Sequence, residues 1–430
     1  MSPFGRWLVS SIELTEPLRE LCCASGYAGI RVVFLWNGLA LGHQRFASEQ
    51  LPLSPQHLAG CAAQAIAPAG GDRILGEGFQ SALPGLPEPD LRDPEAALRQ
   101  LLAIDRPMDQ LADSILPANL TLTVAVCTRE RPGELARCLA SLFALSEPPD
   151  EILVVDNAPE SSDTLEVTAR FPGVRYHCEP RKGLSAARNA ALHVAKGDIV
   201  AFADDDVVVH PEWASRIRRC FDDPRTMLVT GLVLPGELET PAQLMFEEDF
   251  HFFHQGYRRR SFDSDFFNRL RGRSLPVWDI GAGAIMAIRR DAYRRGYSFD
   301  TRLGPGVFGG CGEDSEYFYR LLAGGWSCVY EPSAFVYHFH RREMRDLRRH
   351  VRQYMQGHVA ALLLQFWKYR HWGNLRRLFL ELPAEYAILM LRLIVTGFTL
   401  DNRILLSGAL GCLAGLRFAV TRKPVHTQEQ

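Results

Sequence analysis

The chain has 430 residues, of which 47% are hydrophobic and 23% are charged, and its formal net charge at pH 7 is −2. A single hydrophobic core seldom grows beyond about 300 residues, so this length predicts two or three structural units. The composition is that of an ordinary globular protein, and the charge balance excludes a general attraction to nucleic acid. The ten cysteines form no C-x-x-C pair, which excludes the usual zinc and redox motifs and favours a reducing compartment.

The N-terminal part of the chain predicts a small module followed by a linker. The N-terminus lacks the long apolar run of a secretory signal, so we expect no export. An apolar run at residues 30–36 and a helix-like stretch at 54–66 predict an α+β module over residues 1–70. Residues 71–118 are rich in Pro, Gly, Asp and Ala, which predicts a linker with one helix at 94–104.

From about residue 120 the sequence alternates between β-rich runs and helical patterns. The predicted elements are strands at 122–127, 151–155, 174–178 and 198–203, and helices at 134–145, 164–170 and 184–195. Strands and helices that alternate in this way predict the α/β class, with a mostly parallel sheet covered by helices on both faces. We place this domain at residues 119–342, and its ligands are expected at the carboxyl ends of the strands.

Polar residues follow the first two predicted strands. Thr128 and Arg129 end the first strand, and Asp156 and Asn157 end the second. In a parallel sheet these ends face one crevice, where a hydroxyl and a carboxylate can hydrogen-bond a nucleotide base. Asp156 suits the imide N–H of a pyrimidine. The alternative is that Asp156 and Asn157, followed by Ala and Pro, only form a turn.

The segment 181–189 carries basic residues around the start of a predicted helix. Arg181 and Lys182 precede Gly183, and Arg188 follows one turn into the helix. Free N–H groups, the helix dipole and nearby basic side chains together favour a phosphate at this point. An ordinary helix start is the alternative, although it does not account for the three basic residues.

Two groups of residues have the chemistry of a metal site. Asp204, Asp205 and Asp206 follow a wholly apolar strand, and adjacent carboxylates repel one another unless a cation compensates. Mg²⁺ or Mn²⁺ held by one or two carboxylates and by diphosphate oxygens fits this spacing. His338 and His340 alternate along a later strand, so they share a face, and one of them is a candidate ligand. The alternatives are a solvated acidic loop and two structural histidines.

Glu313 and Asp314 follow a Gly-rich turn and begin a predicted helix. The glycines permit close approach of a ligand, and a carboxylate at this place can meet an acceptor hydroxyl. From the residues alone, helix capping by Asp314 with help from Glu313 is the preferred explanation.

The C-terminal region, residues 343–430, is predicted to be helical and associated with a membrane. It opens with a basic stretch that contains Arg345, Arg348, Arg349 and Arg352, and apolar and aromatic residues follow. This combination suits an anionic membrane surface, whereas a helix packed on the catalytic domain is the alternative. Two apolar stretches at 386–400 and 404–416 are shorter than the roughly 20 residues of a bilayer span, so an interfacial or re-entrant hairpin is predicted.

Taken in order, these segments resemble family 2 of the glycosyltransferases, which have the GT-A fold. The resemblance covers residues 120–342 and rests on six segments, Val124-Ala125-Val126-Cys127-Thr128-Arg129, Val154-Val155-Asp156-Asn157, Gly183-Leu184-Ser185-Ala186-Ala187-Arg188-Asn189, Phe202-Ala203-Asp204-Asp205-Asp206, Ile288-Arg289-Arg290-Asp291, and Gly312-Glu313-Asp314 with Arg320. Each segment alone is common, but the ordered set is specific. Two departures bear on base and acceptor preference: Glu130 stands where many relatives have Asn, and residues 281–286 lack the Asn often found there.

The resemblance implies inverting transfer of a sugar from a nucleotide-diphosphate donor, with Mg²⁺ or Mn²⁺ as the cofactor. The predicted catalytic residues are Asp314, as general base, and Glu313. The predicted nucleotide-sugar residues are Thr128, Arg129, Asp156, Asn157, Arg188, Asp204 and Asp205. The predicted metal ligands are Asp204, Asp206 and His338.

The resemblance also implies an acceptor and a place in the cell. The acceptor is expected to be a hydroxyl of a glycan or of a lipid-linked molecule, in the synthesis of bacterial cell-surface polysaccharide or glycolipid. The protein is expected at the cytoplasmic face of the cell membrane. Two alternatives stay open, an inactive GT-A subunit that binds a nucleotide or a sugar, and a sugar nucleotidyltransferase, which would be expected to carry a Gly-rich, Lys-containing loop near its first strand.

Overall fold

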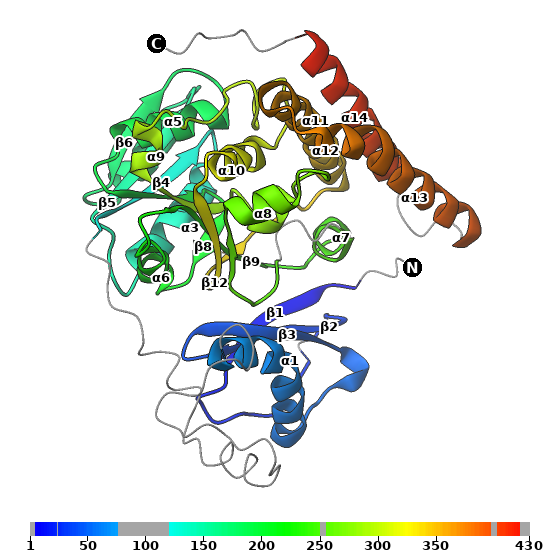
Figure 1. Cartoon of the computed structure of the whole chain (residues 1–430). Helices are drawn as coiled ribbons and strands as arrows, with labels where there is room; N and C mark the ends of the chain where they lie inside the picture. The colour runs from blue at the N-terminus through cyan, green and yellow to red at the C-terminus, as the bar shows by residue number, and fades with distance from the viewer. Residues whose placement is uncertain (1–4, 24, 76–119, 250–254, 397–401, 422–430) are drawn as a thin grey trace, which may run out of the picture. The chain divides into compact units, whose positions relative to one another are not determined.

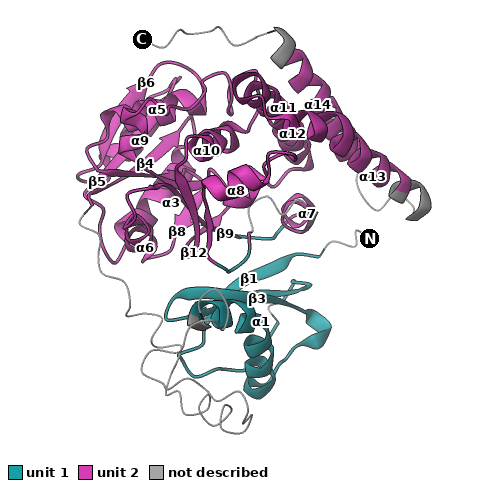
Figure 2. Ribbon diagram, viewed as in Figure 1, with its two compact units in different colours: residues 1–117, 237–239, 256–258 teal, residues 118–236, 240–255, 259–430 magenta. Residues whose placement is uncertain are grey.

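The computed structural model describes residues 5–23, 25–75, 120–249, 255–396 and 402–421. The chain divides into two compact units (Figure 2). Unit 1 comprises residues 1–117, 237–239 and 256–258, and unit 2 comprises residues 118–236, 240–255 and 259–430. The helix predicted at 94–104 lies outside the described residues. The helices of the predicted region 343–430 do not separate from the sheet domain but belong to unit 2.

Unit 1 is a small sheet with one long helix. Its elements are β1 (Trp7–Glu13), β2 (Gly29–Trp36), β3 (Leu39–Ala47), η1 (Ser48–Gln50) and α1 (Pro55–Leu75). β1 pairs with β2 in parallel, and β2 pairs with β3 antiparallel. Alternate residues of β2, Ile30, Val32 and Phe34, form a core with Leu58 and Ala62 of α1, because side chains two apart share one face of a strand. α1 continues to Leu75, past the boundary predicted at residue 70.

Unit 2 is built on a sheet with nine strands among the described residues. They are β4 (Leu122–Thr128), β5 (Glu151–Asn157), β6 (Arg175–Glu179), β7 (Ile199–Asp204), β8 (Val207–Val209), β9 (Thr226–Pro235), β10 (Arg260–Phe262), β11 (Ile285–Arg289) and β12 (Ser327–His338). The strand order is β10-β12-β9-β11-β7-β4-β5-β6, and β8 pairs with β12. Only β8, β10 and β11 run antiparallel to their neighbours. This mostly parallel α/β sheet confirms the predicted fold class.

Helices cover both faces of the sheet (Figure 1). α3 (Pro132–Phe143), α4 (Asp163–Ala169) and α6 (Trp213–Arg219) share one core with alternate residues of β4 and β7. α5 (Leu184–Val194), α9 (Arg290–Arg294) and α10 (Glu313–Ala323) lie on the opposite face. There Phe202 of β7 meets Phe299 edge-on, and Phe299 stacks on Tyr317 of α10 at 4.4 Å between ring centroids. This stack ties α10 to the middle of the sheet.

The register of three strands gathers the polar residues at their carboxyl ends. Thr128 pairs with Asp156 of β5, and Cys127 on the other side pairs with Asp204 of β7. The strands behind these residues are apolar and buried, as expected for a parallel sheet covered on both faces. The first polar side chain after each strand therefore emerges at the same edge.

The C-terminal helices form a layer of their own on unit 2. They are α11 (Met344–Tyr369), α12 (Trp372–Arg376), the π-helical turn η4 (Arg377–Glu381), α13 (Leu382–Thr396) and α14 (Asn402–Thr421). α7 (Pro241–Asp249), α8 (Ser264–Arg269) and η3 (Val277–Ile280) complete the described helices. Figure 1 shows α14 lying along α11. No helix within the described ranges is both long enough and apolar enough to cross a membrane.

Candidate active site

A cavity of about 1510 Å³ opens at the carboxyl edge of the unit 2 sheet. Its wall includes ten of the predicted site residues, Thr128, Arg129, Asn157, Arg188, Asp204, Asp205, Asp206, Glu313, Asp314 and His338. Asp156 is fully buried beneath the wall and does not line the cavity. These residues come from six separated stretches of chain, which therefore converge on one space.

The acidic triplet is held by neighbouring basic and hydroxyl groups. The Thr128 hydroxyl donates to Asp205 at 2.7 Å. Arg131 forms an ion pair with Asp205 and donates to Asp206 Oδ2 at 2.9 Å. Burial raises the pKa of Asp205, although Arg131 opposes this shift. Buried carboxylates this close together favour one further positive charge in the cavity.

Three side chains at this point fit a divalent cation. One ligand atom each from Asp204, Asp206 and His338 lies within 4.8 Å of the others. The pairing of β8 with β12 brings His338 to Asp206, and its Nε2 lies 3.1 Å from Asp206 Oδ1. Burial disfavours a charge on Asp206, but His338 and Arg131 outweigh burial and lower its pKa. Two carboxylates and an imidazole suit Mn²⁺, and with diphosphate oxygens they also suit Mg²⁺.

His340 does not join this group. Its ring lies 4.6 Å from the ring of His338 between centroids, but its Nε2 is directed toward Glu247, 3.8 Å away. Of the two histidines that share a face, the structure therefore places only His338 beside the acidic triplet.

Gly283 joins Asp314 to the buried Arg188. Its N–H donates to Asp314 Oδ2 at 2.9 Å, and its carbonyl accepts from Arg188 at 2.9 Å. Arg188 is 2% exposed and also pairs with Glu313 at 2.8 Å and with Asp204 at 3.5 Å. Arg188 thus links the start of α10 to the end of β7. Gly312 is the N-cap residue of α10, so the cap predicted for Asp314 from the residues alone is wrong.

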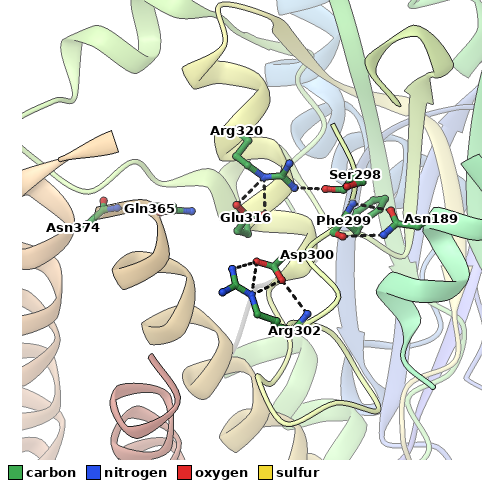
Figure 3. Close-up of polar contacts among 9 residues, drawn as sticks. All are labelled: Asn189, Ser298, Phe299, Asp300, Arg302, Glu316, Arg320, Gln365 and Asn374. Atoms are coloured by element: carbon green, nitrogen blue, oxygen red, sulfur yellow. Dashed lines mark hydrogen bonds and ion pairs between the residues drawn. The ribbon is translucent and has the colours of Figure 1, made fainter. Parts of the chain in front are cut away.

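The chain that leads into Asp314 is held by polar contacts to α5 and α10 (Figure 3). Asn189 of α5 exchanges two hydrogen bonds with the backbone of Phe299, at 2.8 and 2.9 Å. Arg320 of α10 pairs with Glu316 at 2.8 Å and donates to the carbonyl of Ser298 at 2.6 Å. Both side chains belong to segments that carry the family resemblance. Their contacts position the turn that carries Asp314 against α5.

Asp156 and Asn157 have different surroundings. The Tyr176 hydroxyl donates to Asp156 Oδ2 at 2.9 Å, and burial raises the pKa of Asp156. Asn157 donates to the carbonyl of Arg181 at 2.7 Å and accepts from the N–H of Gly183 at 2.8 Å. Asn157 therefore shapes the basic segment before α5 and does more than form a turn.

The three basic side chains of residues 181–188 make different contacts. Arg181 forms a bidentate ion pair with Glu179, in which each of the two hydrogen bonds is 2.9 Å long. Lys182 is exposed and lines the cavity. Arg188 is the buried link described above. Of the three basic residues around the helix start, Lys182 is therefore the side chain in position to meet a phosphate.

Arg129 and Glu130 order the loop that follows β5. Glu130 has φ +52°, and its carboxylate accepts from the N–H of Glu160 at 2.7 Å and from the Ser161 hydroxyl at 3.1 Å. Arg129 pairs with Glu160 and donates to the carbonyl of Ala158. The Glu130 side chain thereby reaches the loop that follows β5.

Arg131 is a site residue that the sequence reasoning missed. It lies in the loop after β4, and its guanidinium is 23% exposed between two carboxylates of the acidic triplet. The sequence shows two arginines directly after the first predicted strand, in the run Thr128-Arg129-Glu130-Arg131. The partner carboxylates lie more than 70 residues farther along the chain, so no local pattern joins them to Arg131.

Comparison with known proteins defines the class of this domain. Residues 123–295 match the model of glycosyl transferase family 2. The chain therefore contains a family 2 glycosyltransferase domain, which confirms the predicted family.

Curated relatives match over part of their length. The chain is 30% identical to succinoglycan biosynthesis protein ExoM of Rhizobium meliloti over 232 residues, which are 51% of this chain and 66% of that protein. It is 30% identical to the pre-mycofactocin glycosyltransferase of Mycobacterium tuberculosis over 54% of this chain and 45% of that protein. It is 25% identical to the glucosyl-dolichyl phosphate glucuronosyltransferase of Haloferax volcanii, over 43% and 58%. The chain thus spans two thirds or less of these relatives.

A solved structure with a partial likeness is the mannosyltransferase PcManGT from Pyrobaculum calidifontis in complex with GDP-Man and Mn²⁺. The sequence identity is 18%, the TM-score is 0.45, and the match covers 72% of this chain and 89% of that one.

Proposed function

We propose that the protein is a metal-dependent, inverting glycosyltransferase that moves a sugar from a nucleotide-diphosphate donor to a hydroxyl of a glycan or lipid-linked acceptor. The observation that carries this proposal is the single cavity that contains both Asp314 and the group Asp204, Asp206 and His338. A carboxylate that accepts a proton and ligands for a cation are what a one-step displacement at an anomeric carbon needs.

The donor binds at the sheet edge in this proposal. Thr128, Arg129 and Asn157 line the cavity where we place the base, whereas Asp156, buried behind this wall, supports the site through its hydrogen bond with Tyr176. Lys182, which is exposed and lines the cavity, faces the diphosphate in this proposal. Asp204 and Asp205 reach the ribose, while Arg188 acts by holding Asp204 and Glu313 in place.

Asp204, Asp206 and His338 are the residues that hold the cation in this proposal. Mg²⁺ or Mn²⁺ supplies positive charge that stabilises the diphosphate as it leaves. Arg131 supplies a further positive charge at the same carboxylates, so the chain itself neutralises part of the triplet.

Asp314 is the general base of the proposed reaction. The Gly283 N–H and the Ser315 N–H each donate to one of its oxygens, which fixes the carboxylate plane. Asp314 takes the proton of the acceptor hydroxyl as its oxygen bonds to the anomeric carbon. The bond to the diphosphate oxygen breaks in the same step, and the nucleoside diphosphate leaves with inversion. Glu313 supports this step through its pair with Arg188.

Asp314→Asn tests the proposal. We expect transfer to fall by about 10²- to 10⁴-fold, the usual range for the loss of a general base, while Mn²⁺-dependent binding of the donor nucleotide is retained. Thermal stabilisation by UDP or GDP with Mn²⁺ measures that binding. Asp291→Asn is the matched control, because Asp291 is a partly exposed carboxylate that pairs with Arg295 and lies outside the cavity wall. Normal turnover of the Asp314 variant would remove this residue from the mechanism.

We place this enzyme at the cytoplasmic face of a bacterial membrane, in the synthesis of cell-surface polysaccharide or glycolipid. The relatives named above support the process. On α11, Arg345 and Arg349 are exposed, with side chains 77% and 63% accessible. Exposed basic side chains near apolar helix faces favour peripheral association with an anionic bilayer.

A further inference from the structure

The cavity extends well beyond the residues used for the donor. Its far half is formed by α11, η4, α13 and α14, and its wall contains Leu362, Leu382, Leu389, Ile404 and Leu405 together with Gln365, Arg377, Glu385 and Tyr386. Polar and charged side chains thus line one end, and the other end is lined mainly by aliphatic side chains, with the Arg377–Glu385 ion pair among them. A ligand that fills the whole cavity must itself have a polar and an apolar part.

Trp278 and His358 lie between the two ends. Both line the cavity, and their rings meet edge-on with centroids 5.4 Å apart. His358 Nε2 is buried without a hydrogen-bond partner, and burial lowers the pKa of His358 to about 4. The imidazole is therefore neutral at physiological pH, so its free nitrogen suits a sugar hydroxyl better than a phosphate. An indole beside it offers the apolar surface that a sugar ring packs on.

α11 brings this pair close to the catalytic turn. A Cβ on Gly357 would overlap the carbonyl of Cys311, so α11 lies directly on the turn that ends at Asp314. The Cys311 N–H also donates to the carbonyl of Gln353 on α11, at 3.1 Å. His358 follows Gly357 on the same helix. A sugar held by His358 therefore lies against α11, the helix that packs on this turn.

The apolar end of the cavity leads to exposed aliphatic surface. On α13, Ile388 and Leu391 are 54% and 61% exposed, and on α14, Leu406 is 60% exposed. A Cβ on Gly408 of α14 would overlap the Tyr386 hydroxyl of α13, so the two helices pack closely at this place. Exposed aliphatic side chains therefore lie on the same two helices that contribute Leu382, Leu389, Ile404 and Leu405 to the cavity wall.

We propose, building on the glycosyltransferase function above, that this half of the cavity binds the hydrocarbon chain of a lipid-linked acceptor, with the acceptor sugar held by Trp278 and His358. The chain enters between α13 and α14, and the sugar hydroxyl reaches Asp314. A free sugar or a soluble glycan fills only the polar half.

Binding of alkyl β-glucosides to the full chain tests this assignment. Methyl, hexyl, octyl and decyl glucoside are titrated below their micelle concentrations, and binding is followed by calorimetry. Burial of a methylene is worth about 0.8 kcal/mol, so affinity is expected to rise about fourfold for each methylene that enters the cavity. Equal affinity along the series would overturn the proposal. Decylphosphocholine, which has the chain without the sugar, is expected to bind at least about tenfold more weakly than decyl glucoside, and equal binding would assign the groove to bilayer lipid.

Two matched variants locate the bound chain. Leu389→Glu places a charge in the apolar end, and we expect a loss of at least about tenfold for decyl glucoside with little change for methyl glucoside. Leu165→Glu, on α4 and 46% exposed, lies outside the cavity and is expected to change neither. An equal loss in both variants would show surface adsorption and overturn the assignment. Leu405→Trp, which narrows the cavity without a charge, serves the same purpose if Leu389→Glu does not fold.

The same samples separate this proposal from the proposed function. Stabilisation by UDP or GDP with Mn²⁺ reports the donor site and confirms that each variant is folded. Absence of nucleotide binding in the unmodified chain would count against the glycosyltransferase function itself. Nucleotide binding together with affinity that is independent of chain length would reject only the lipid-linked acceptor.

Discussion

At the scale of single residues, Gly283 sets the position of the proposed base. A Cβ at this position would lie 2.7 Å from Asp314 Oδ2 and 3.0 Å from its Cβ. Gly283→Ala is therefore expected to displace the carboxylate by a few tenths of an ångström or more and to lower the turnover number by about 10²-fold, because misplaced reacting groups cost that much. Steady-state kinetics with the donor identified by nucleotide screening measure the effect.

The control for Gly283 is Gly272→Ala, in which the added Cβ meets no atom within 4 Å. We expect this variant to keep its turnover number. Nucleotide binding with Mn²⁺ is expected to survive in both variants, since neither glycine is among the residues proposed to hold the nucleotide or the cation. A Gly283→Ala enzyme with unchanged kinetics would show that Asp314 does not depend on this contact.

His358 makes the stability of the protein sensitive to acid. Its pKa is lowered from 6.5 to about 4 by burial, with a smaller contribution from Arg377. In the unfolded chain the imidazole takes up a proton near pH 6.5, whereas in the native state it stays neutral until about pH 4. The free energy of unfolding therefore falls as pH decreases from 6.5 to 4, and this histidine alone contributes at most about 2 kcal/mol of that loss between pH 7.5 and pH 5.

The variant His358→Gln shows how much of the acid sensitivity comes from His358. Its side chain is polar and of similar length but does not titrate. Urea denaturation at pH 7.5 and at pH 5 gives the free energy of unfolding for both proteins. We expect the difference between the two pH values to be smaller in the variant. The same difference in both would show that His358 is not neutral in the native state.

At the scale of elements, the strands that carry the site follow from local pattern, but their partners do not. The ends of β4, β5 and β7 were predictable because apolar runs stop at Thr128, Asp156 and Asp204. Pairing of β8 with β12, which brings His338 to Asp206, joins segments about 130 residues apart and leaves no local signal. The role of Arg131 was missed for the same reason, since its carboxylate partners are distant in sequence.

Glycines decide how the C-terminal helices pack. The sequence offers Gly411 and Gly415 as a G-x-x-x-G pair, and the structure places both against α11, where a Cβ would overlap the carbonyls of Arg352 and Gln356. Close approach of two helix backbones needs small residues at the contact. This packing explains why residues 404–416 form part of a helix layer on unit 2, and the interfacial or re-entrant hairpin predicted for residues 386–400 and 404–416 stays a prediction.

Gly411→Ala tests this packing. The added methyl has no room beside α11, so we expect a loss of about 1–3 kcal/mol in the free energy of unfolding, as for overpacked cores. Gly133→Ala on α3 is the matched control, because its Cβ meets nothing within 4 Å and alanine favours a helix. Thermal denaturation is expected to shift down for Gly411→Ala and to stay level or rise for Gly133→Ala. A stable Gly411→Ala protein would mean that α14 is not tightly packed.

At the scale of the whole molecule, the outer face of α14 is the surface through which we expect contact with a membrane. Leu406, Leu410 and Leu413 are 60%, 43% and 62% exposed and recur at helical spacing, opposite the glycines that pack on α11. Because the glycine face keeps α14 in place, serines at these three leucines are expected to leave the fold intact. Deletion of α14 would instead expose the apolar face of α11 on which α14 packs. A loss of vesicle binding could then result from unfolding as well as from the loss of a membrane contact.

Co-sedimentation with vesicles that contain anionic phosphatidylglycerol measures the contact. A leucine that enters the bilayer contributes about 1.5–3 kcal/mol when fully buried, so partial insertion of three predicts a loss of binding of at least about tenfold in the triple serine variant. Leu165→Ser, on α4 and 46% exposed, is the control and is expected to bind as the unmodified chain does. Vesicle binding that is unchanged in the triple variant would show that the outer face of α14 does not contact lipid. Any association with the membrane would then depend on the exposed arginines of α11. Binding through arginines weakens as the salt concentration rises, whereas binding through the leucines does not.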